Sequence, residues 1–178
     1  KFRHLQVPIK PGAAAKEKTK SFLSELRSQI VDGGSSFSDI AKTHSLDPSK
    51  NNGGELGWVK RGSLVKSFET EAFTIELGEI SNPIETEFGY HILETLEKQG
   101  DKIRVRHVLM SPEITKDDNE RAYNLAFAIR DSATTLGEFK KLVKKHSSDK
   151  TTIDIGGDLG WIDPTSYTVP EVGQAIKY

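Results

Sequence analysis

Hydrophobic and polar residues alternate at the start of the chain and then change to a helical spacing. Residues 2–7 alternate and carry aromatic and branched side chains, which predicts a β-strand. In residues 13–31, apolar Phe22, Leu26 and Ile30 recur every four positions and a pair of glycines follows. This spacing predicts an amphipathic helix that ends at the glycines.

The pattern after this helix predicts a short helix from Phe37, a strand over residues 57–62 and another short helix over residues 66–73. Residues 77–96 then predict two strands joined at Glu87–Gly89, with His91 and Tyr90 on opposite faces of the second strand. Because no helix separates these two strands, we expect a largely antiparallel sheet with helices packed on it, an α+β class.

The chain contains two copies of one sequence unit. Three segments recur in the same order at offsets of 102 or 103 residues: "RHLQV" at 3–7 with "RHVLM" at 106–110, "FSDIAKTHS" at 37–45 with "FKKLVKKHS" at 139–147, and "GGELGW" at 53–58 with "GGDLGW" at 156–161. The repeat predicts a complete domain over residues 1–97, a polar linker over 98–102 and a second domain over 103–178. The second copy lacks an equivalent of the hairpin over residues 77–96, so we expect it to leave a sheet edge open.

Composition excludes several classes of chemistry. The chain has 178 residues, a formal net charge of −1 and no cysteine, so disulfides, thiolate nucleophiles and sulfur-bound metals are excluded. The near-neutral charge predicts no nucleic-acid partner, and the lysines of residues 140–145 are better explained as a solvated helix face. No apolar run approaches the ~18 residues of a spanning helix, so we expect no direct membrane insertion.

The repeated glycine phrase has two interpretations, a phosphate-binding loop or a tight turn. A phosphate loop would need Gly-Lys-Ser/Thr, or G-x-G-x-x-G between a strand and a helix, and neither is present. Here the glycines follow a polar loop and lead into Leu56 and Trp58, which have the spacing of a strand. Glycine allows a tight turn into that strand, so we interpret the phrase as structural.

These segments together resemble the parvulin family of peptidyl-prolyl isomerases. The resemblance is carried by "RHLQV", "HSLDP", "GGELGW", "RGSLVKSFETEAF" and "LGEISNPIETEFGYHIL", in the family's order. The tandem arrangement resembles the SurA-type folding factors of the Gram-negative periplasm. The resemblance implies two parvulin-like domains, each an antiparallel four-stranded sheet flanked by helices, with the second copy truncated.

The resemblance also implies an activity and a location. It implies a peptidyl-prolyl cis-trans isomerase that needs no cofactor and no metal, with the activity in the first domain. Its partners would be unfolded or proline-containing polypeptide segments, with outer-membrane protein precursors as candidate clients, and its location periplasmic or otherwise extracytoplasmic. The alternative function is a chaperone or peptide-binding module that has the parvulin fold and little or no turnover.

Site residues follow from matching positions of the family motif. The implied catalytic residues are His4, Ser45, Asp47, Thr86 and His91, with His4 and His91 as the paired central histidines. The implied substrate-binding residues are Leu64, Val65, Phe68 and Phe88. Val65 departs from the glutamine that many parvulins carry there. In the second copy His107 and Asp149 match the first histidine and the acid.

Each of these residues also has a structural interpretation. A single histidine is more often structural or exposed, Asp47-Pro48 could be a simple turn, and Leu64 and Phe68 could be plain core residues. Two histidines and Asp47 could also suggest zinc, but their spacing fits no usual ligand pattern.

Overall fold

The structure is a computed structural model, and it describes residues 1–163. The chain forms two compact units. The first, called the 11–113 unit, is Pro11–Glu113; the other, called the second unit, combines Lys1–Lys10 with the chain from Ile114 onward. Each unit is described by itself.

This division differs from the expected domains over residues 1–97 and 103–178. The first strand of each sequence copy lies in the unit that contains the rest of the other copy. Relative to the copies expected from the sequence, the two first strands are therefore exchanged between the units.

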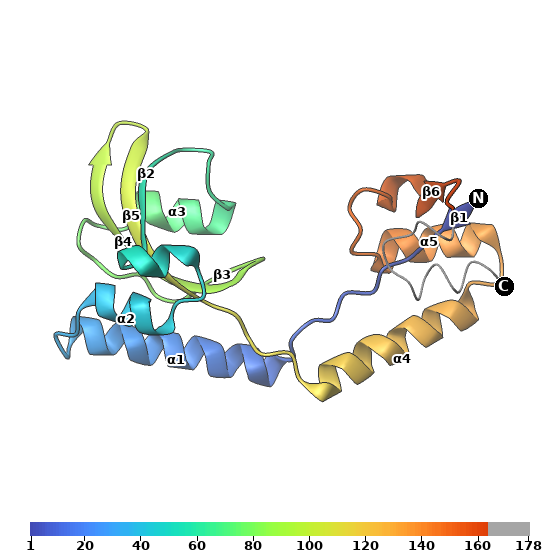
Figure 1. Cartoon of the computed structure of the whole chain (residues 1–178), viewed down its shortest axis with the longest axis horizontal. Helices are drawn as coiled ribbons and strands as arrows, with labels where there is room; N and C mark the ends of the chain where they lie inside the picture. Colours follow the sequence, from blue (N-terminus) through green and yellow to red (C-terminus); the bar gives the residue numbers. More distant parts are fainter. Residues whose placement is uncertain (164–178) are drawn as a thin grey trace. The chain divides into compact units, whose positions relative to one another are not determined.

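Helices and strands follow one another in the 11–113 unit in the order expected for an α+β fold (Figure 1). They are α1 (Ala13–Val31), α2 (Phe37–His44), the 3₁₀ helix η1 (Pro48–Asn52), β2 (Glu55–Lys60), α3 (Lys66–Thr74), β3 (Ile84–Thr86), β4 (Gly89–Gln99) and β5 (Lys102–Met110). The predicted bounds of α1 and the turn between β3 and β4 are confirmed.

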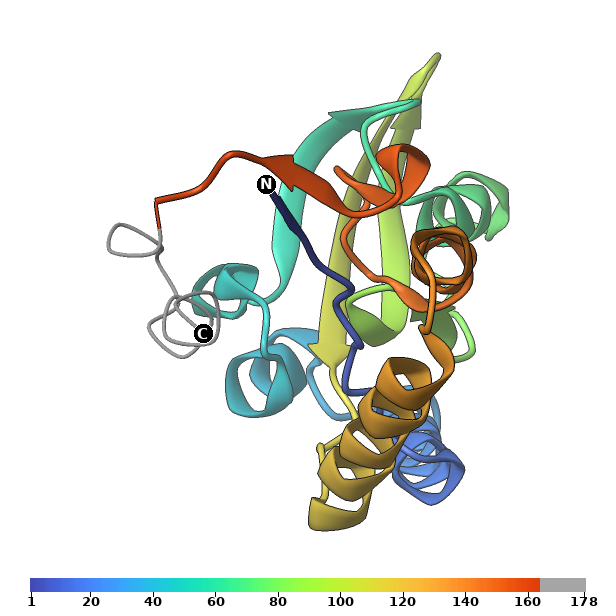
Figure 2. The ribbon, with the colours of Figure 1, turned by 90° about the vertical axis from the view of Figure 1, so that its right-hand side faces the viewer.

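The four strands form one antiparallel sheet in the order β2-β5-β4-β3 (Figures 1 and 2). The expected α+β class, with an antiparallel four-stranded sheet flanked by helices, is confirmed. β5 and β4 are the central strands, and their side chains are covered on both faces of the sheet.

Residues 98–102, expected to be a linker, form the end of a tight hairpin instead. Lys98 and Gln99 belong to β4, Lys102 belongs to β5, and Gln99 pairs with Lys102 across a two-residue turn. Gly100 in this turn has a φ of 59°, the left-handed backbone that two-residue hairpin turns require and glycine readily adopts. A polar segment with a central glycine is compatible with both a linker and a hairpin turn. Here β4 extends to Gln99 and β5 begins at Lys102, so the segment forms a hairpin turn.

The sheet of the 11–113 unit separates two hydrophobic clusters. On one face, Leu23 and Leu26 of α1 and Phe37 of α2 pack against Ile92 of β4 and Val108 of β5. On the other face, α3 packs over the opposite sides of the same two central strands. Alternate residues of β4 and β5 therefore point toward α3, among them both histidines of these strands.

The described part of the second unit, up to residue 163, contains a short two-stranded sheet and two α-helices. β1 (Phe2–Arg3) pairs antiparallel with β6 (Asp158–Gly160), and β1 and β6 lie side by side in Figure 1. The remaining elements are α4 (Lys116–Ser132), α5 (Leu136–His146) and the 3₁₀ helix η2 (Ile153–Ile155). Within residues 1–163, no helix is both long and apolar enough to cross a membrane.

The glycine phrase forms a tight turn, as the sequence predicted, and Gly54 in it also allows a close approach of another strand. A Cβ atom on Gly54 would lie 2.3 Å from the carbonyl oxygen of His107, and Gly54 has a φ of 84°. The amide of His107 in turn donates to the carbonyl of Gly54 at 2.9 Å. Gly54 thus allows β5 to approach the turn that precedes β2.

Gly54→Ala is expected to destabilise the 11–113 unit more than Gly57→Ala, as measured by urea unfolding. Both positions have left-handed φ, which costs a side chain about 1–2 kcal/mol. At Gly57 no described atom lies within 4 Å of the added Cβ, whereas at Gly54 the backbone of β5 must move, for a further ~1–3 kcal/mol. Equal losses in the two variants would show that β5 does not pack against Gly54.

Candidate active site

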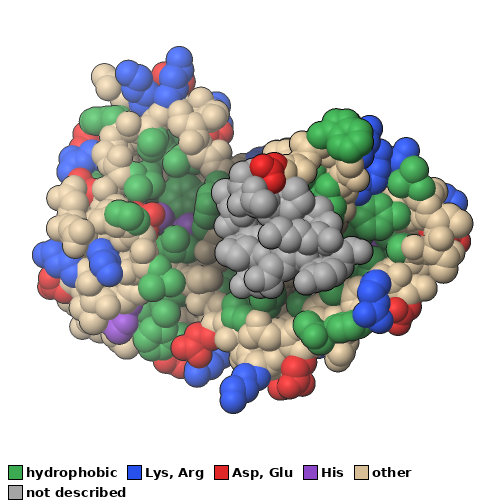
Figure 3. Space-filling view, turned by 45° about the vertical axis from the view of Figure 1, so that its right-hand side comes forward, with side chains coloured by type: hydrophobic (Ala, Val, Ile, Leu, Met, Phe, Trp, Pro, Cys, Tyr) green, Lys and Arg blue, Asp and Glu red, His purple; other side chains and the backbone are tan. Residues whose placement is uncertain are grey.

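A cavity of about 280 Å³ opens in the 11–113 unit beneath α3. It is lined by Asp47, Leu56, Leu64, Val65, Phe68, Thr86, Phe88, His91, His107 and Leu109. Histidine side chains are visible among hydrophobic ones on the left-hand unit in the space-filling view (Figure 3). The cavity therefore combines an apolar wall with a small set of polar groups, as small-ligand sites usually do.

The polar groups form a continuous chain of contacts across the floor of the cavity. Thr86 Oγ1 lies 2.7 Å from His91 Nε2, at one end. His91 Nδ1 lies 3.2 Å from His107 Nδ1, with the two ring planes 15° apart. At the other end, His107 Nε2 lies 3.4 Å from Asp47 Oδ1. Four residues from a loop and three strands thus share one network.

One direction of hydrogen bonding fits the contacts between the two histidines and Thr86. The Asp47 carboxylate faces His107 Nε2 at 3.4 Å without a hydrogen bond, and its negative charge favours the proton on that nitrogen, so that His107 Nδ1 accepts. His91 then donates from Nδ1 and accepts at Nε2 from the hydroxyl of Thr86. Thr86 Oγ1 in turn accepts from the amide of Phe88 at 3.1 Å. Both histidines are neutral in this arrangement, and each ring is fixed in one tautomer.

Burial keeps both rings neutral. Burial and the nearby His107 lower the pKa of His91 to about 4 from its ordinary 6.5, with Asp47 opposing. Burial also lowers the pKa of His107, which the Asp47 carboxylate opposes. Desolvation raises the pKa of Asp47, but hydrogen bonds from Ser49 and the interaction with His107 outweigh it and leave that pKa below its ordinary value. The site at neutral pH therefore holds two neutral imidazoles and one carboxylate.

The free energy of unfolding of the 11–113 unit is expected to decrease as the pH falls from 6.5 to 4. Between these values the unfolded chain protonates His91 and the folded chain does not, so stability rises with pH in this window. The loss reaches up to about 3 kcal/mol, at about 1.4 kcal/mol per pKa unit. The measurement is urea unfolding followed by Trp58 fluorescence, with Trp161→Phe in the background so that the reporter lies in this unit.

His91→Gln is expected to flatten this pH dependence, because it removes the titrating ring. The matched control is His146→Gln, which replaces a histidine of the second unit and should leave the slope unchanged. A slope that is the same in wild type and His91→Gln would show that His91 is not held neutral.

Phe68 lines the cavity and also belongs to the hydrophobic cluster on this face of the sheet. Its side chain is 4% exposed, and its ring meets those of His91 and His107 edge-on at centroid distances of 5.2 and 5.5 Å. Leu64 and Val65, expected with Phe68 to bind substrate, line the same cavity just before α3. Phe88 is 60% exposed and stands at the mouth.

Ser45 lies next to the network without joining it. Its buried hydroxyl accepts from the amides of Leu109 at 3.1 Å and Asp47 at 3.3 Å. The Asp47 side chain caps η1 by accepting from the amide of Ser49 at 2.8 Å. Ser45 therefore positions β5 and the Asp47 backbone, while Asp47 both forms a turn and faces His107.

The structure differs from the sequence expectation for His4. His4 was expected to pair with His91, but it lies in the second unit, where its Nε2 is 2.6 Å from Asp149 Oδ2. His107, expected to belong with Asp149, takes the place beside His91. The reason is the exchange of first strands, which places each histidine next to the carboxylate of the other sequence copy.

Asp149 is held by a hydroxyl network in the second unit. Hydrogen bonds from Thr151, Thr152 and His4 keep the pKa of Asp149 well below its ordinary value. Thr152 Oγ1 donates to Asp149 Oδ2 at 2.6 Å. The hydroxyl–carboxylate–imidazole group thus recurs in the second unit, but within the described residues it has no second histidine beside it.

Sequence reasoning missed three residues of the cavity. His107 was assigned to the other domain, and Leu56 and Leu109 were not assigned to the site. A signal for Leu109 was present, because it shares a strand face with His107 two positions earlier. Leu56 belongs to the glycine phrase. Because that phrase was interpreted as structural, the contact of Leu56 with the cavity was not predicted.

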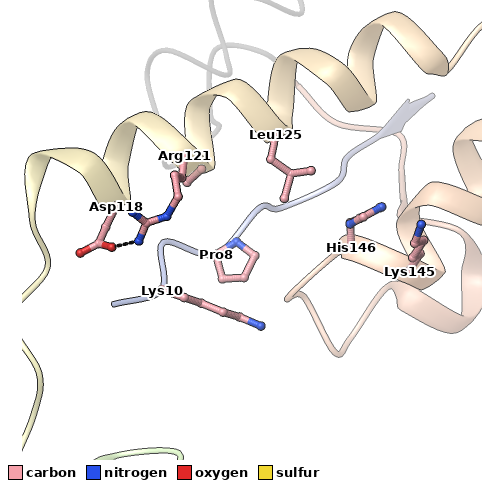
Figure 4. A pocket seen from close by; sticks show the side chains of 8 residues that line it. Pro8, Lys10, Asp118, Arg121, Leu125, Lys145 and His146 are labelled. Carbon is pink, nitrogen blue, oxygen red and sulfur yellow. Dashed lines mark hydrogen bonds and ion pairs between the residues drawn. The ribbon is translucent and has the colours of Figure 1, made fainter. Parts of the chain in front are cut away.

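A separate pocket of about 240 Å³ lies within the second unit (Figure 4). It is lined by Pro8, Lys10, Asp118, Arg121, Ala122, Leu125, Lys145 and His146. Arg121 forms an ion pair with Asp118 there. Because neither His4 nor Asp149 lines it, this pocket is not an equivalent of the cavity in the 11–113 unit.

The chain belongs to the PPIC-type PPIase domain family, the rotamases, whose model matches residues 4–97 and again 107–177. The fold and the site thus define a parvulin-type peptidyl-prolyl isomerase domain. The two matched ranges correspond to the two copies of the sequence repeat.

The relatives of this chain are folding factors by name. It is 30% identical to the chaperone SurA of Idiomarina loihiensis over 169 residues, which is 92% of this chain and 38% of that protein. It is 34% identical to the chaperone SurA of Pseudomonas fluorescens (strain Pf0-1) over 80% of this chain and 34% of that protein. A crystal structure of the peptidylprolyl isomerase PrsA from Bacillus cereus matches 78% of this chain and 50% of that one, with 30% identity and a TM-score of 0.38. The chain spans less than half the length of these curated relatives.

Proposed function

We propose that the 11–113 unit catalyses the cis-trans isomerisation of X–Pro peptide bonds in unfolded polypeptides. The observation that carries the proposal is the apolar cavity over two neutral, hydrogen-bonded histidines. Membership of the PPIC-type family supports the same reaction.

The reaction requires little covalent chemistry. Resonance gives the X–Pro bond partial double-bond character, with a barrier of roughly 20 kcal/mol and exchange over tens to hundreds of seconds. In the twisted transition state this resonance is lost, so the carbonyl oxygen carries less negative charge and the amide is less polar. An apolar cavity therefore stabilises the twisted amide more than either planar form.

The residues of the cavity divide this task. Leu64, Phe68 and Leu109 would hold the proline ring and exclude water from it. The contacts from Thr86 through His91 to His107 would hold both rings in place on the floor of the cavity, with the Asp47 carboxylate facing His107. Phe88 at the mouth would contact the residue next to proline.

The names of the relatives support a setting for this activity. We propose that the clients are unfolded, proline-containing segments of extracytoplasmic proteins, with outer-membrane protein precursors among them, and that the chain acts in the periplasm or another extracytoplasmic space. The second unit would contribute binding rather than turnover, because its described part contains one histidine–carboxylate pair and no partner ring.

A second candidate function is supported by the chaperone name of the SurA relatives: binding of extended chains with incidental turnover. The two functions separate when turnover of an X–Pro peptide and binding of a reduced, alkylated unfolded protein are measured on the same chain. The isomerase proposal expects both, and Phe68→Leu should lower turnover more than binding of the unfolded protein. Background turnover with unchanged binding would favour the chaperone.

A further inference from the structure

The pocket of about 240 Å³ in the second unit combines cationic and apolar side chains. Figure 4 shows side chains from α4, from the end of α5 and from residues 8–10 around this space. α4 contributes Leu125, and α5 contributes Lys145 and His146. All of these residues belong to the second unit, so the pocket is formed within one unit.

The one acidic side chain of the pocket has its charge balanced by its neighbours. Asp118 Oδ2 accepts from the amide and from the hydroxyl of Thr115, each at 2.8 Å. Asp118 Oδ1 forms the ion pair with Arg121, and the Asp118 side chain is 1% exposed. The acid thus caps α4 and holds Arg121, and it does not present a charge to a ligand.

The two lysines of the pocket have no such partner. Within residues 1–163, neither Lys10 nor Lys145 forms an ion pair or a side-chain hydrogen bond. His146 lines the same space and adds a ring that can donate a hydrogen bond. Ammonium groups that share a pocket without an acidic partner favour an anionic ligand.

The first copy of the sequence unit does not carry these lysines. At the offsets of the repeat, Lys10 corresponds to Glu113 and Lys145 corresponds to Thr43. The second unit therefore has two cations that its counterpart lacks, and one of them stands in the place of an acid. Because the two copies share one sequence pattern, the fold alone does not require positive charge here.

The apolar side of the pocket also differs between the copies. In the 11–113 unit, the ring of Phe22 meets the ring of His44 edge-on at a centroid distance of 5.5 Å. The equivalent residues of the second unit are Leu125 and His146, and both line the pocket. Leucine has no ring to cover the histidine, and Leu125 is 40% exposed. The second unit thus presents an apolar wall beside its unpaired cations.

We propose that this pocket binds a carboxylate of an unfolded polypeptide together with the apolar side chain next to it. The pocket is smaller than the ~300–1,000 Å³ of sites for drug-sized ligands, so it fits a group of about one residue. The ammonium groups of Lys10 and Lys145 would hold the carboxylate by charge-assisted hydrogen bonds, and Leu125 and Pro8 would contact the apolar part. Inorganic phosphate has no apolar part to cover this wall, so it fits the pocket less well.

Two parts of a polypeptide supply this chemistry, a chain end with an apolar last residue and an acidic side chain beside an apolar one. The inference names the ligand class for the binding role proposed for the second unit. It does not depend on isomerase turnover in the 11–113 unit.

Titration of the intact chain with proline-free peptides, followed by the NMR signals of the His146 ring, tests the proposal. The probes are acetyl-Gly-Ser-Gly-Ser-Leu with a free C-terminal carboxylate, the same peptide amidated, and amidated acetyl-Gly-Ser-Glu-Leu-Ser. The free-carboxylate peptide should shift the His146 signals saturably, while the ring of His4, which does not line the pocket, keeps its signals. The amidated peptide without glutamate should bind at least ~10-fold more weakly, the loss typical of removing a charge-assisted hydrogen bond.

The glutamate peptide distinguishes the two sources of the carboxylate. Binding as tight as that of the free-carboxylate peptide would assign the pocket to acidic side chains, and much weaker binding would assign it to chain ends; both results support a carboxylate site. Equal binding of the two forms of the glutamate-free peptide would overturn the proposal. So would tighter binding of inorganic phosphate than of any peptide, or His146 signals that respond to none of the probes.

A pair of double variants tests the lysines. Lys10→Gln with Lys145→Gln should weaken binding of the free-carboxylate peptide at least ~10-fold, because both cations are lost. The matched control, Lys116→Gln with Lys144→Gln, removes the same charge from lysines of the second unit that do not line the pocket, and should leave the affinity unchanged. Unchanged His4 signals in each variant would show that the unit is folded.

An equal loss of affinity in the two double variants would overturn the proposal, because the overall charge of the unit and not the pocket would then attract the peptide. Turnover of an X–Pro peptide by the wild-type chain is measured separately. Its absence would count against the proposed isomerase function and leave the titration valid.

Discussion

His107→Ala is expected to reduce X–Pro turnover by about 100-fold, because a cavity floor displaced by ~1 Å can cost this much. The change leaves the buried His91 Nδ1 without its partner and removes the ring that faces the Asp47 carboxylate. An unpaired buried polar group costs about 1–3 kcal/mol, so the 11–113 unit should also be less stable. Turnover of an X–Pro peptide and urea unfolding followed by Trp58 fluorescence measure the two effects.

The matched control is His4→Ala, which removes the equivalent histidine of the other copy. His4 contacts Asp149 in the second unit, so turnover should remain that of wild type. The opposite result, with His4→Ala inactive and His107→Ala active, would mean that residues 1–7 and not β5 complete the working site.

Phe68→Ala is expected to have the largest effect on stability, a loss of about 3–5 kcal/mol in the free energy of unfolding. The side chain is 4% exposed and packs with Ala72, Ile75 and Leu93 in the cluster beneath α3. The same substitution removes the ring that faces both histidines, so KM for an X–Pro peptide should rise under conditions where the variant is still folded.

Two further variants separate the core role of Phe68 from its role in the cavity. Phe68→Leu keeps most of the buried volume and should recover stability, while KM remains raised. Phe73→Ala removes a partly buried ring that packs on the same cluster and carries Arg61 over its face but does not line the cavity. It should lower stability and leave KM unchanged; a raised KM in Phe73→Ala would show that stability alone explains both effects.

Local pattern was sufficient to predict most elements of the 11–113 unit. The four-residue spacing of apolar side chains in α1, and the alternation that separates His91 from Ile92 in β4, reflect contacts between near neighbours in the sequence. The placement of Asp47, Thr86 and His91 around one cavity followed from the family motif.

The partner of His91 could not be predicted from the pattern. Residues 3–7 and 106–110 share Arg-His and a strand-like pattern, so the sequence alone does not show which of them lies between β2 and β4. The choice depends on the length of the connection to β4. A two-residue turn at Gly100 joins β4 to β5, whereas residues 8–88 separate residues 1–7 from β4. A repeat in the sequence identifies equivalent segments without showing which copies pair.

Exchange spectroscopy by NMR on an X–Pro peptide with a small amount of the intact chain tests the central claim most directly, because it detects turnover without a coupling enzyme. The spontaneous exchange takes tens to hundreds of seconds, so cis–trans cross-peaks that appear on the sub-second scale report catalysis. The account predicts such cross-peaks for wild type, together with shifts of the His91 and His107 ring signals on peptide binding and the loss of both effects in His107→Ala. A folded wild-type chain whose histidine signals respond to the peptide while its cis–trans exchange stays at the spontaneous rate would contradict the account.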